Sequence, residues 1–206
     1  MQVEMIKILL KIKLFFVILT IGSVLKADPY SLANISQYLT NLKFLKADFL
    51  QTSADGAASS GAILIKRPGR MRFEYYKPDK TLVLISSGAL AIFDPKGDEE
   101  PITYPIKNNP ISLVLTGEVD LLNSGIVENY EKSIEEAVLT VRDPKRPERG
   151  SVELVFTGAK PELKNFTIKN ENGSSTTILL KDIEYPKKIN ETLFSISLEI
   201  NKRKKN

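Results

Sequence analysis

"AILIKRPGRMRFEYYKP", residues 62–78, alternates apolar side chains on both sides of a short turn. This period of two predicts a pair of adjacent β-strands. The turn between them carries four cations, which are Lys66, Arg67, Arg70 and Arg72. A guanidinium that faces an apolar interior must find acceptors, because an unpaired buried charge is strongly unfavourable.

Arg67 is the cation best placed for a buried role, since Pro68 favours an extended backbone at the residue before it and fixes the strand end. Its natural acceptors would be the carbonyl groups of a covering helix or a nearby carboxylate. The alternative is that all four cations only solvate the tip of a hairpin. The residue chemistry leaves both interpretations open.

Short apolar runs separated by turn signals continue on both sides of this stretch. They predict strands near 47–53, 61–67, 70–77, 81–86, 89–94, 102–106, 125–130, 136–142, 151–157, 163–170, 175–184 and 193–198. Asn172-Gly173 supplies the positive-φ residues of a tight hairpin turn. Because no βαβ spacing occurs, the pattern predicts a large antiparallel meander or barrel.

Helical patterns interrupt the strands at two places. One amphipathic helix is predicted from apolar residues spaced by three and four, namely Leu32, Ile35, Tyr38, Leu39, Leu42 and Leu45. Pro110 is placed to initiate a short helix or two in "NNPISLVLTGEVDLL", residues 108–122. The run "ALAIFDP", residues 89–95, predicts a strand with apolar neighbours on both faces. We therefore expect a strongly curved sheet whose concave face is covered by helices.

The first 27 residues are typical of a secretory signal peptide, with lysines at 7, 11 and 13 before an apolar run over 14–25. This run is shorter than the ~20 residues that span a membrane, although an uncleaved anchor is the competing interpretation. Residues 28–206 are then predicted to form a single domain that ends in a basic tail, "NKRKKN". This tail is expected to be frayed and solvated, with a binding arm as the alternative.

The composition excludes several kinds of chemistry. The chain has no cysteine and no histidine, so disulfides, thiolate metal sites and the usual general base near neutral pH are excluded. Of the net charge of +4, the leader to residue 27 carries +3, which leaves little reason to expect nucleic-acid binding. The remaining candidates for catalysis are better explained as turn residues, so we expect no enzyme and no cofactor or metal. They are Ser86, Ser87, Asp94, Glu99 and Glu100.

Four segments occur in the order found in the LolA family of periplasmic lipoprotein carriers, which the chain resembles. These segments are "ADFLQ" (47–51), "GAILIKRPGRMRFEY" (61–75), "KPDKTLVLISSGALAIFDP" (77–95) and "FTIKNENGSSTTILL" (166–180). The sequence departs from the family pattern at the C-terminus, in Phe93 where tyrosine is frequent, and in lacking a tryptophan near Ala91.

The resemblance implies an α+β fold, an incomplete antiparallel β half-barrel covered by an α-helical lid. It implies a periplasmic chaperone whose apolar cavity takes the acyl chains of lipoproteins from an inner-membrane ABC transporter and delivers them to an outer-membrane receptor. It further implies that Arg67 latches the lid by bonding to lid carbonyls, and that Arg70 and Arg72 contact partners. We expect a monomer that binds no nucleic acid.

The apolar cavity is predicted from one face of the strands together with the first helix. Its candidates are Leu32, Ile35, Leu39, Leu42, Met71, Phe73, Tyr75, Val83, Ile85, Leu90 and Ile92. The strand residues among them could equally form an ordinary core. Two other functions stay open: a half-barrel that carries free lipid or senses lipoproteins for a signalling partner, and an envelope protein held by an uncleaved leader.

Overall fold

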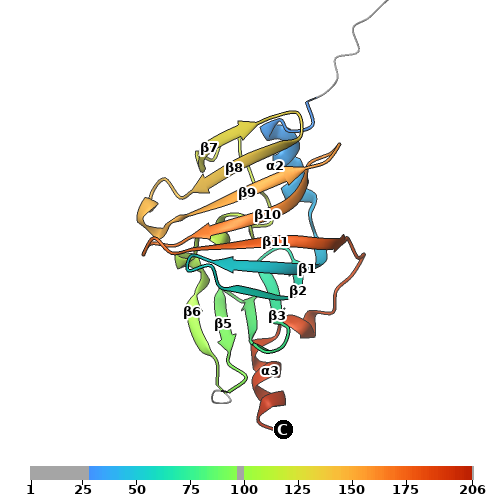
Figure 1. Cartoon of the computed structure of the whole chain (residues 1–206), viewed down its shortest axis with the longest axis vertical. Coiled ribbons are helices and arrows are strands. Elements are labelled where there is room, and N and C mark those ends of the chain that lie inside the picture. The colour runs from blue at the N-terminus through green and yellow to red at the C-terminus, as the bar shows by residue number, and fades with distance from the viewer. Residues whose placement is uncertain (1–27, 97–99, 206) are drawn as a thin grey trace, which may run out of the picture.

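The fold is an antiparallel sheet of 11 strands in a computed structural model that describes residues 28–96 and 100–205. Its spatial order is β6-β5-β4-β3-β2-β1-β11-β10-β9-β8-β7, so β6 and β7 are the two edges of an open sheet (Figure 1). The predicted signal peptide, 1–27, lies outside the described residues. The strands are β1 (Phe44–Ser53), β2 (Ala58–Lys66), β3 (Arg70–Tyr75), β4 (Leu82–Ser86), β5 (Ala89–Phe93), β6 (Ile102–Pro105), β7 (Val127–Lys132), β8 (Glu136–Arg142), β9 (Ser151–Thr157), β10 (Glu162–Lys169) and β11 (Ser175–Glu184).

The strand direction changes along the sheet. β7 to β11 run across the view of Figure 1, whereas β5 and β6 run along the long axis of the molecule. The strong curvature and the open edges confirm the predicted half-barrel. Each predicted strand from 47–53 to 175–184 is present, with its ends shifted by a few residues.

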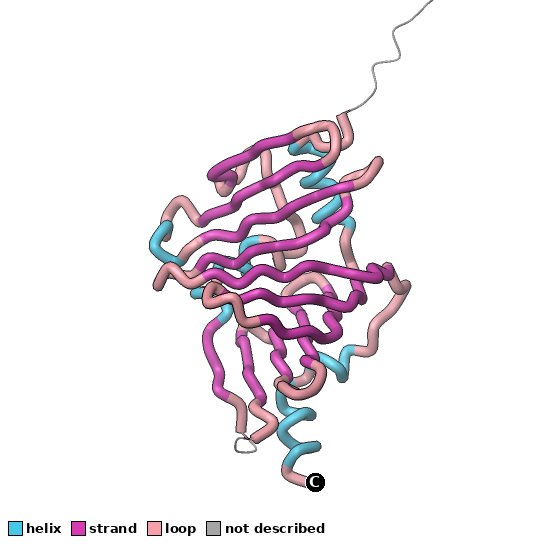
Figure 2. Tube along the Cα trace, viewed as in Figure 1, coloured by secondary structure: helices cyan, strands magenta, loops and turns pink. Residues whose placement is uncertain are grey.

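The helices are short and lie in the connections before, between and after the strands (Figure 2). They are the α-helices α2 (Leu32–Asn41) and α3 (Ile196–Arg203) and the 3₁₀-helices η1 (Ile106–Asn108), η2 (Pro110–Leu113), η3 (Pro147–Arg149) and η4 (Glu191–Phe194). The predicted interruption near Pro110 is therefore confirmed as η1 and η2. None of the helices within the described ranges is long and apolar enough to cross a membrane.

Helix α2 begins and ends close to its predicted position. Ser31 caps its N-terminus by accepting a hydrogen bond from the backbone N–H of Asn34 at 3.2 Å. The prediction that Leu45 belongs to this helix is wrong, because the helix ends at Asn41 and Leu45 is in β1. Leu45 fits two periods at once: it follows α2 at a helical spacing, and it alternates with the buried Ala47 and Phe49 of the strand.

The alternation in β3, β4 and β5 separates an inner face from an outer face. Met71 lies opposite Ile85, and Phe73 lies opposite Val83; these side chains belong to the large core cluster that includes α2. The outer face forms a second cluster of Leu82, Leu84, Ala91 and Phe93, against which α3 packs with Ile196 and Ile200. The predicted burial of the 89–95 strand on both faces is thus confirmed.

The prediction of a strand over 193–198 is wrong, because this segment forms η4 and the start of α3. Ser195 caps α3 by accepting a hydrogen bond from the N–H of Leu198 at 3.2 Å. Ile196 and Ile200 are one helical turn apart and share the face that contacts the sheet. Apolar residues also occupy the alternate positions 196, 198 and 200, as they would in a strand. The period of two was therefore misleading.

The predicted frayed tail is also wrong for its first residues. Arg203 is the last residue of α3, donates to a carboxylate oxygen of Glu199 at 3.2 Å, and lies 4.8 Å above the ring of Phe93. Lys204 donates to Glu100 at 2.6 Å. The basic tail is therefore anchored beside the β5–β6 hairpin (Figure 1).

Candidate functional site

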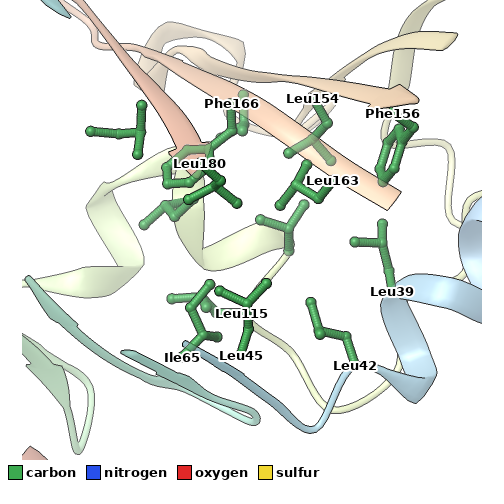
Figure 3. Close-up of a cluster of buried hydrophobic side chains, with 14 of the residues drawn as sticks. Leu39, Leu42, Leu45, Ile65, Leu115, Leu154, Phe156, Leu163, Phe166 and Leu180 are labelled. Carbon is green, nitrogen blue, oxygen red and sulfur yellow. The ribbon is translucent and has the colours of Figure 1, made fainter. Parts of the chain in front are cut away.

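The interior between α2 and the sheet is a continuous apolar cluster. Figure 3 shows side chains from α2, from β1 and β2, and from β9 to β11 pointing toward one another. None of the labelled side chains is more than 7 % exposed. They are Leu39, Leu42, Leu45, Ile65, Leu115, Leu154, Phe156, Leu163, Phe166 and Leu180.

A small cavity of about 30 Å³ remains inside this cluster. Its lining residues are Leu39, Leu42, Ile65, Arg67, Met71, Ile111, Val114, Leu115, Leu154, Leu163 and Phe166. Sites for ligands of drug size are roughly 300–1,000 Å³, so this space is far too small for a fatty chain. The structure therefore represents a closed form, and a larger apolar guest would require the cover of the cavity to move.

The cover has two parts that are hydrogen-bonded to each other. The first is α2, and the second is the segment 110–121, which contains η2 and the loop after it. Ser36 of α2 donates to the carbonyl of Val119 and accepts from the N–H of Leu121 at 3.2 Å. Thr40 accepts from the N–H of Val119 at 3.2 Å. We call α2 and residues 110–121 together the lid.

Arg67 joins the lid to the turn between β2 and β3. Its Nε donates to the carbonyl oxygen of Thr116 at 3.1 Å, and its Nη2 donates to the same oxygen. Two residues later, the N–H of Gly69 donates to the carbonyl of Leu115 at 2.8 Å. The Arg67 side chain is only 6 % exposed. The carbonyl acceptors expected for a buried cation are thus present in the lid.

Burial dominates the electrostatics of Arg67. It lowers the pKa of the guanidinium to about 10, while the neighbouring Tyr38 acts in the opposite direction. The group stays a cation at neutral pH, and no carboxylate of the described residues lies within ion-pair distance of it. Its Nη1 has no hydrogen-bond partner within the same residues.

Two tyrosines hydrogen-bond to each other beside the lid, and Tyr38 of α2 is the neighbour of Arg67. The Tyr38 hydroxyl accepts from the N–H of Leu163 at 3.2 Å and lies 3.2 Å from the hydroxyl of Tyr185. The Tyr38 ring meets Phe156 edge to face, with centroids 5.8 Å apart. Burial raises the pKa of both tyrosines, so both are neutral phenols at physiological pH.

Most of the predicted cavity residues belong to the inner core cluster. Ile35, Leu39, Leu42, Met71, Phe73 and Ile85 are buried in it, and Leu32, Tyr75, Val83 and Leu90 pack against it half-buried. Ile92 lies on the same face of β5 but outside the described cluster. Leu39, Leu42 and Met71 line the small cavity itself.

The other three cations of the hairpin lie on the outer face and contact the C-terminal segment of the same chain. Lys66 donates to Glu191, whereas Arg70 lies 3.8 Å from the same carboxylate. Arg72 donates from Nη1 to the carbonyl of Leu193 at 3.0 Å. The four cations therefore divide between two faces: one holds the lid and three hold the C-terminal segment.

Several residues of the site were missed by sequence reasoning. The acceptor of the Arg67 side chain is the main-chain oxygen of Thr116, and a carbonyl group leaves no mark in a sequence. Leu154, Leu163 and Phe166 line the far wall of the cavity. Their alternation in the predicted strands was a usable signal, but it did not indicate which sheet half faces α2.

Of the candidates for catalysis, Ser86 is the last residue of β4, Ser87 and Asp94 lie in the connections after β4 and β5, and Glu99 lies outside the described residues. Ser87 has a positive φ of 51° between β4 and β5, and Asp94 accepts from the N–H of Lys96 at 2.8 Å. Within the part of the chain that the structure describes, no group of three or more acidic side chains is arranged to hold a metal ion. The site defines a protein that encloses an apolar interior beneath α2 and residues 110–121.

Comparisons with known proteins identify the family. Residues 40–197 match the model of the family described as "Outer membrane lipoprotein carrier protein LolA", so the chain belongs to the LolA family. It is 26 % identical over 199 residues to an outer-membrane lipoprotein carrier protein of Coxiella burnetii strain CbuK_Q154, with 92 % of each chain covered. A protein of the same name from Methylococcus capsulatus is 24 % identical over 187 residues, covering 85 % of this chain and 88 % of its own.

Among solved structures, a LolA superfamily protein from Nitrosomonas europaea is similar to this chain with a TM-score of 0.44 and 11 % sequence identity. The match covers 78 % of this chain and 97 % of the other.

Proposed function

We propose that this chain is a periplasmic carrier that binds the acyl chains of lipoproteins released from the inner membrane and delivers them to an outer-membrane receptor. The observation that carries the proposal is the closed apolar interior whose lid is held by Arg67 at the carbonyl of Thr116. Membership of the LolA family supports the same class of cargo. An inner-membrane ABC transporter would load the carrier.

The lid contacts oppose retention of the cargo. Each buried methylene of a fatty chain contributes about 0.8 kcal/mol, so an open apolar cavity would hold a triacylated protein too tightly to release it. In the closed form, the bonds of Arg67 and Gly69 to the segment 115–116 compete with the cargo. A ligand shifts such an equilibrium only by its differential affinity for the two forms. Closing the lid therefore favours transfer to the receptor.

The proposed cavity in the open form is lined by the inner face of the sheet and by α2. The predicted residues of both elements keep this role, with Leu39, Leu42 and Met71 nearest the space present in the closed form. Arg70 is proposed as a contact for the transporter or the receptor, since its side chain is 37 % exposed. The proposed role of Arg72 would require its bond to Leu193 to open.

The test uses inner-membrane vesicles that contain an acylated lipoprotein or its cysteine variant, which cannot be acylated. The purified chain without residues 1–27 is added with ATP, and the soluble fraction is assayed for the released lipoprotein. We expect release of the acylated form alone. Release of neither form, together with copurified lipid, would instead support a carrier of free lipid, and stable binding without hand-over would support a sensor.

The proposed latch is tested by a transfer step that follows release in the same assay. The Arg67→Leu variant should load normally but accumulate cargo, because the empty closed form loses two hydrogen bonds to Thr116. Transfer to membranes that carry the receptor is the quantity to measure. Hand-over at the rate of the unchanged chain would rule out the latch.

A further inference from the structure

The guanidinium of Arg67 is a polar group at the wall of an otherwise apolar cavity. The ten other lining residues are leucine, isoleucine, valine, methionine or phenylalanine. The Arg67 residue is 6 % exposed, and its Nη1 has no hydrogen-bond partner among the described residues. Buried donors are rarely left unpaired in folded proteins, so this one requires an explanation.

The donors of Arg67 share a single acceptor in the closed form. Nε and Nη2 both use the carbonyl oxygen of Thr116, although a guanidinium offers five N–H donors in a planar fork. The nearby hydroxyl of Tyr38 accepts from Leu163 and lies within hydrogen-bond distance of Tyr185. The closed protein therefore leaves the cation under-satisfied on the side of the cavity.

Opening of the lid increases the number of Arg67 N–H donors that lack an acceptor. Thr116 belongs to the segment 110–121, so its carbonyl leaves Arg67 when this segment moves away. Nε and Nη2 then join Nη1 as donors without an acceptor, while the surrounding walls stay apolar. Alkyl chains that fill the space offer no acceptor, and a buried unpaired cation is strongly disfavoured. A guest that fills the space and excludes water must then supply the acceptors itself.

We infer that Arg67 recognises the acyl carbonyl oxygens of the cargo, so that the cavity selects acylated over alkylated guests. This inference rests on the proposed carrier function. An acyl group carries a carbonyl oxygen at the head of its alkyl chain, which can replace the carbonyl of Thr116. The same N–H donors then serve the lid in the empty protein and the cargo in the loaded protein. The carbonyl of the guest thereby offsets part of the loss of the latch, so the closed empty form still keeps the larger share of the Arg67 bonds.

The carbonyl oxygen that Arg67 binds could belong to an ester of a lipoprotein or phospholipid, or to a fatty acid. We assign it to the ester groups of the lipoprotein, since the proposed cargo carries them. The test therefore compares two synthetic lipopeptides that have the same peptide and the same chain lengths. One carries its two chains through esters, and the other carries them through ethers, which lack the carbonyl.

The affinities of both lipopeptides are measured by displacement of a fluorescent fatty probe from the unchanged chain and from two variants. The unchanged chain should bind the ester at least tenfold more tightly than the ether, which corresponds to one hydrogen bond from a charged donor. In Arg67→Leu the ratio should fall to about one. Arg142→Leu is the matched control, because its side chain bonds to Glu128 and does not line the cavity, and it should keep the ratio.

A second measurement is made on the unchanged chain, so its main result does not depend on whether a variant folds. The ester carbonyl is labelled with ¹³C, and its infrared stretching band is recorded for the lipopeptide bound to the unchanged chain. A shift of this band to lower frequency is expected, because a charged donor bonds to the oxygen. Arg67→Lys, which retains the charge but not the fork, should reduce the shift.

The outcomes separate this inference from the proposed function. Equal binding of the ester and the ether by the unchanged chain overturns the inference and leaves the carrier function standing. Binding of neither lipopeptide overturns both. Equal binding of the two lipopeptides together with Arg67-dependent binding of palmitate would also overturn it, and would assign the cation to a carboxylate of free fatty acid.

Discussion

The two faces of the sheet are each covered by a short helix, but the covers are attached in different ways. On the inner face, α2 packs by apolar side chains, and the polar attachment of the lid to the β2–β3 turn is concentrated at Arg67 and Gly69. On the outer face, α3 contributes only Ile196 and Ile200 to the apolar cluster.

The cover of the outer face consists of residues 191–204, which contain η4 and α3. This outer cover also makes ion pairs and other polar contacts along its whole length. Glu191 meets Lys66 and Arg70, Arg72 bonds to the carbonyl of Leu193, and Arg203 lies above the ring of Phe93. A contact concentrated in one turn can be lost in a single step, whereas a distributed set must break contact by contact. Release of the lid from the β2–β3 turn therefore needs the loss of contacts at two residues, whereas release of the outer cover needs the loss of contacts at several.

The largest effect on stability is expected from replacing a buried leucine by alanine in either apolar cluster. Leu154→Ala on the inner face and Leu84→Ala on the outer face each remove a side chain that is at most 1 % exposed. Each should lower the free energy of unfolding by about 2–5 kcal/mol, measured by urea denaturation. Only Leu154→Ala should change the affinity for an acylated lipopeptide. An equal change in affinity for both variants would contradict the division of the two faces.

The attachment of α3 is tested by placing charges on its apolar side. The double variant Ile196→Asp, Ile200→Asp should detach the helix at a loss of about 1–3 kcal/mol, because two partly buried side chains lose their contact with β4 and β5. Trypsin should then cleave the released tail at Lys202 or Arg203. Lipopeptide affinity is expected to be unchanged. An altered affinity would mean that the two covers are coupled through the sheet.

An alkaline titration tests the burial of Tyr75 on the inner face of the sheet. Burial raises the pKa of Tyr75 to about 12, compared with about 10 in an unfolded chain. Folding thus favours the neutral phenol, so the corresponding stability is complete below pH 10 and is lost as pH rises from about 10 to 12. Tyr75→Phe should make this loss of stability shallower, and should cost about 1 kcal/mol at neutral pH through the bond to Gln51.

The measurement is the urea midpoint of Tyr75→Phe between pH 8 and 12. Tyr104→Phe is the control, because the side chain of Tyr104 is 53 % exposed on the edge strand β6. An unchanged alkaline slope for Tyr75→Phe would contradict its burial beside Phe49, whose ring meets it edge to face at 5.1 Å.

The smallest effect is expected for a single ion pair of the outer cover. Arg70→Leu removes a contact of 3.8 Å between two well-exposed groups. Surface pairs of this kind contribute about 0.2–1 kcal/mol, so the urea midpoint should change little at low salt and not at all in 1 M salt. A loss as large as that of the α3 double variant would show that the polar contacts, and not the apolar ones, hold the outer cover.

The sheet could be predicted from the sequence because its signals are local. Met71, Phe73 and Tyr75 alternate with charged residues on one strand, and Asn172-Gly173 marks the last hairpin. The pattern failed where one spacing fits two structures, as at Leu45. It failed again at 193–198, where the capping residue Ser195 was the overlooked sign of a helix.

The site was only partly predictable. The residue chemistry left a buried role for Arg67 open beside a solvated one, and only the family resemblance implied a bond to the lid. The acceptor at Thr116 and the bonds of Ser36 and Thr40 to the loop depend on backbone atoms brought together from distant parts of the chain. The sequence did not assign Arg72 to a face of the sheet, and its partner Leu193 lies 121 residues away.

The unpaired edges β6 and β7 have a consequence for capacity. In a closed barrel, the number of strands and their stagger fix the interior width. Here the described sheet ends at β6 on one side and at β7 on the other, so no ring of hydrogen bonds sets a limit. Small changes of twist between successive strands can add up and spread the edges apart. An open sheet of this kind can thus widen or narrow to fit guests of different size.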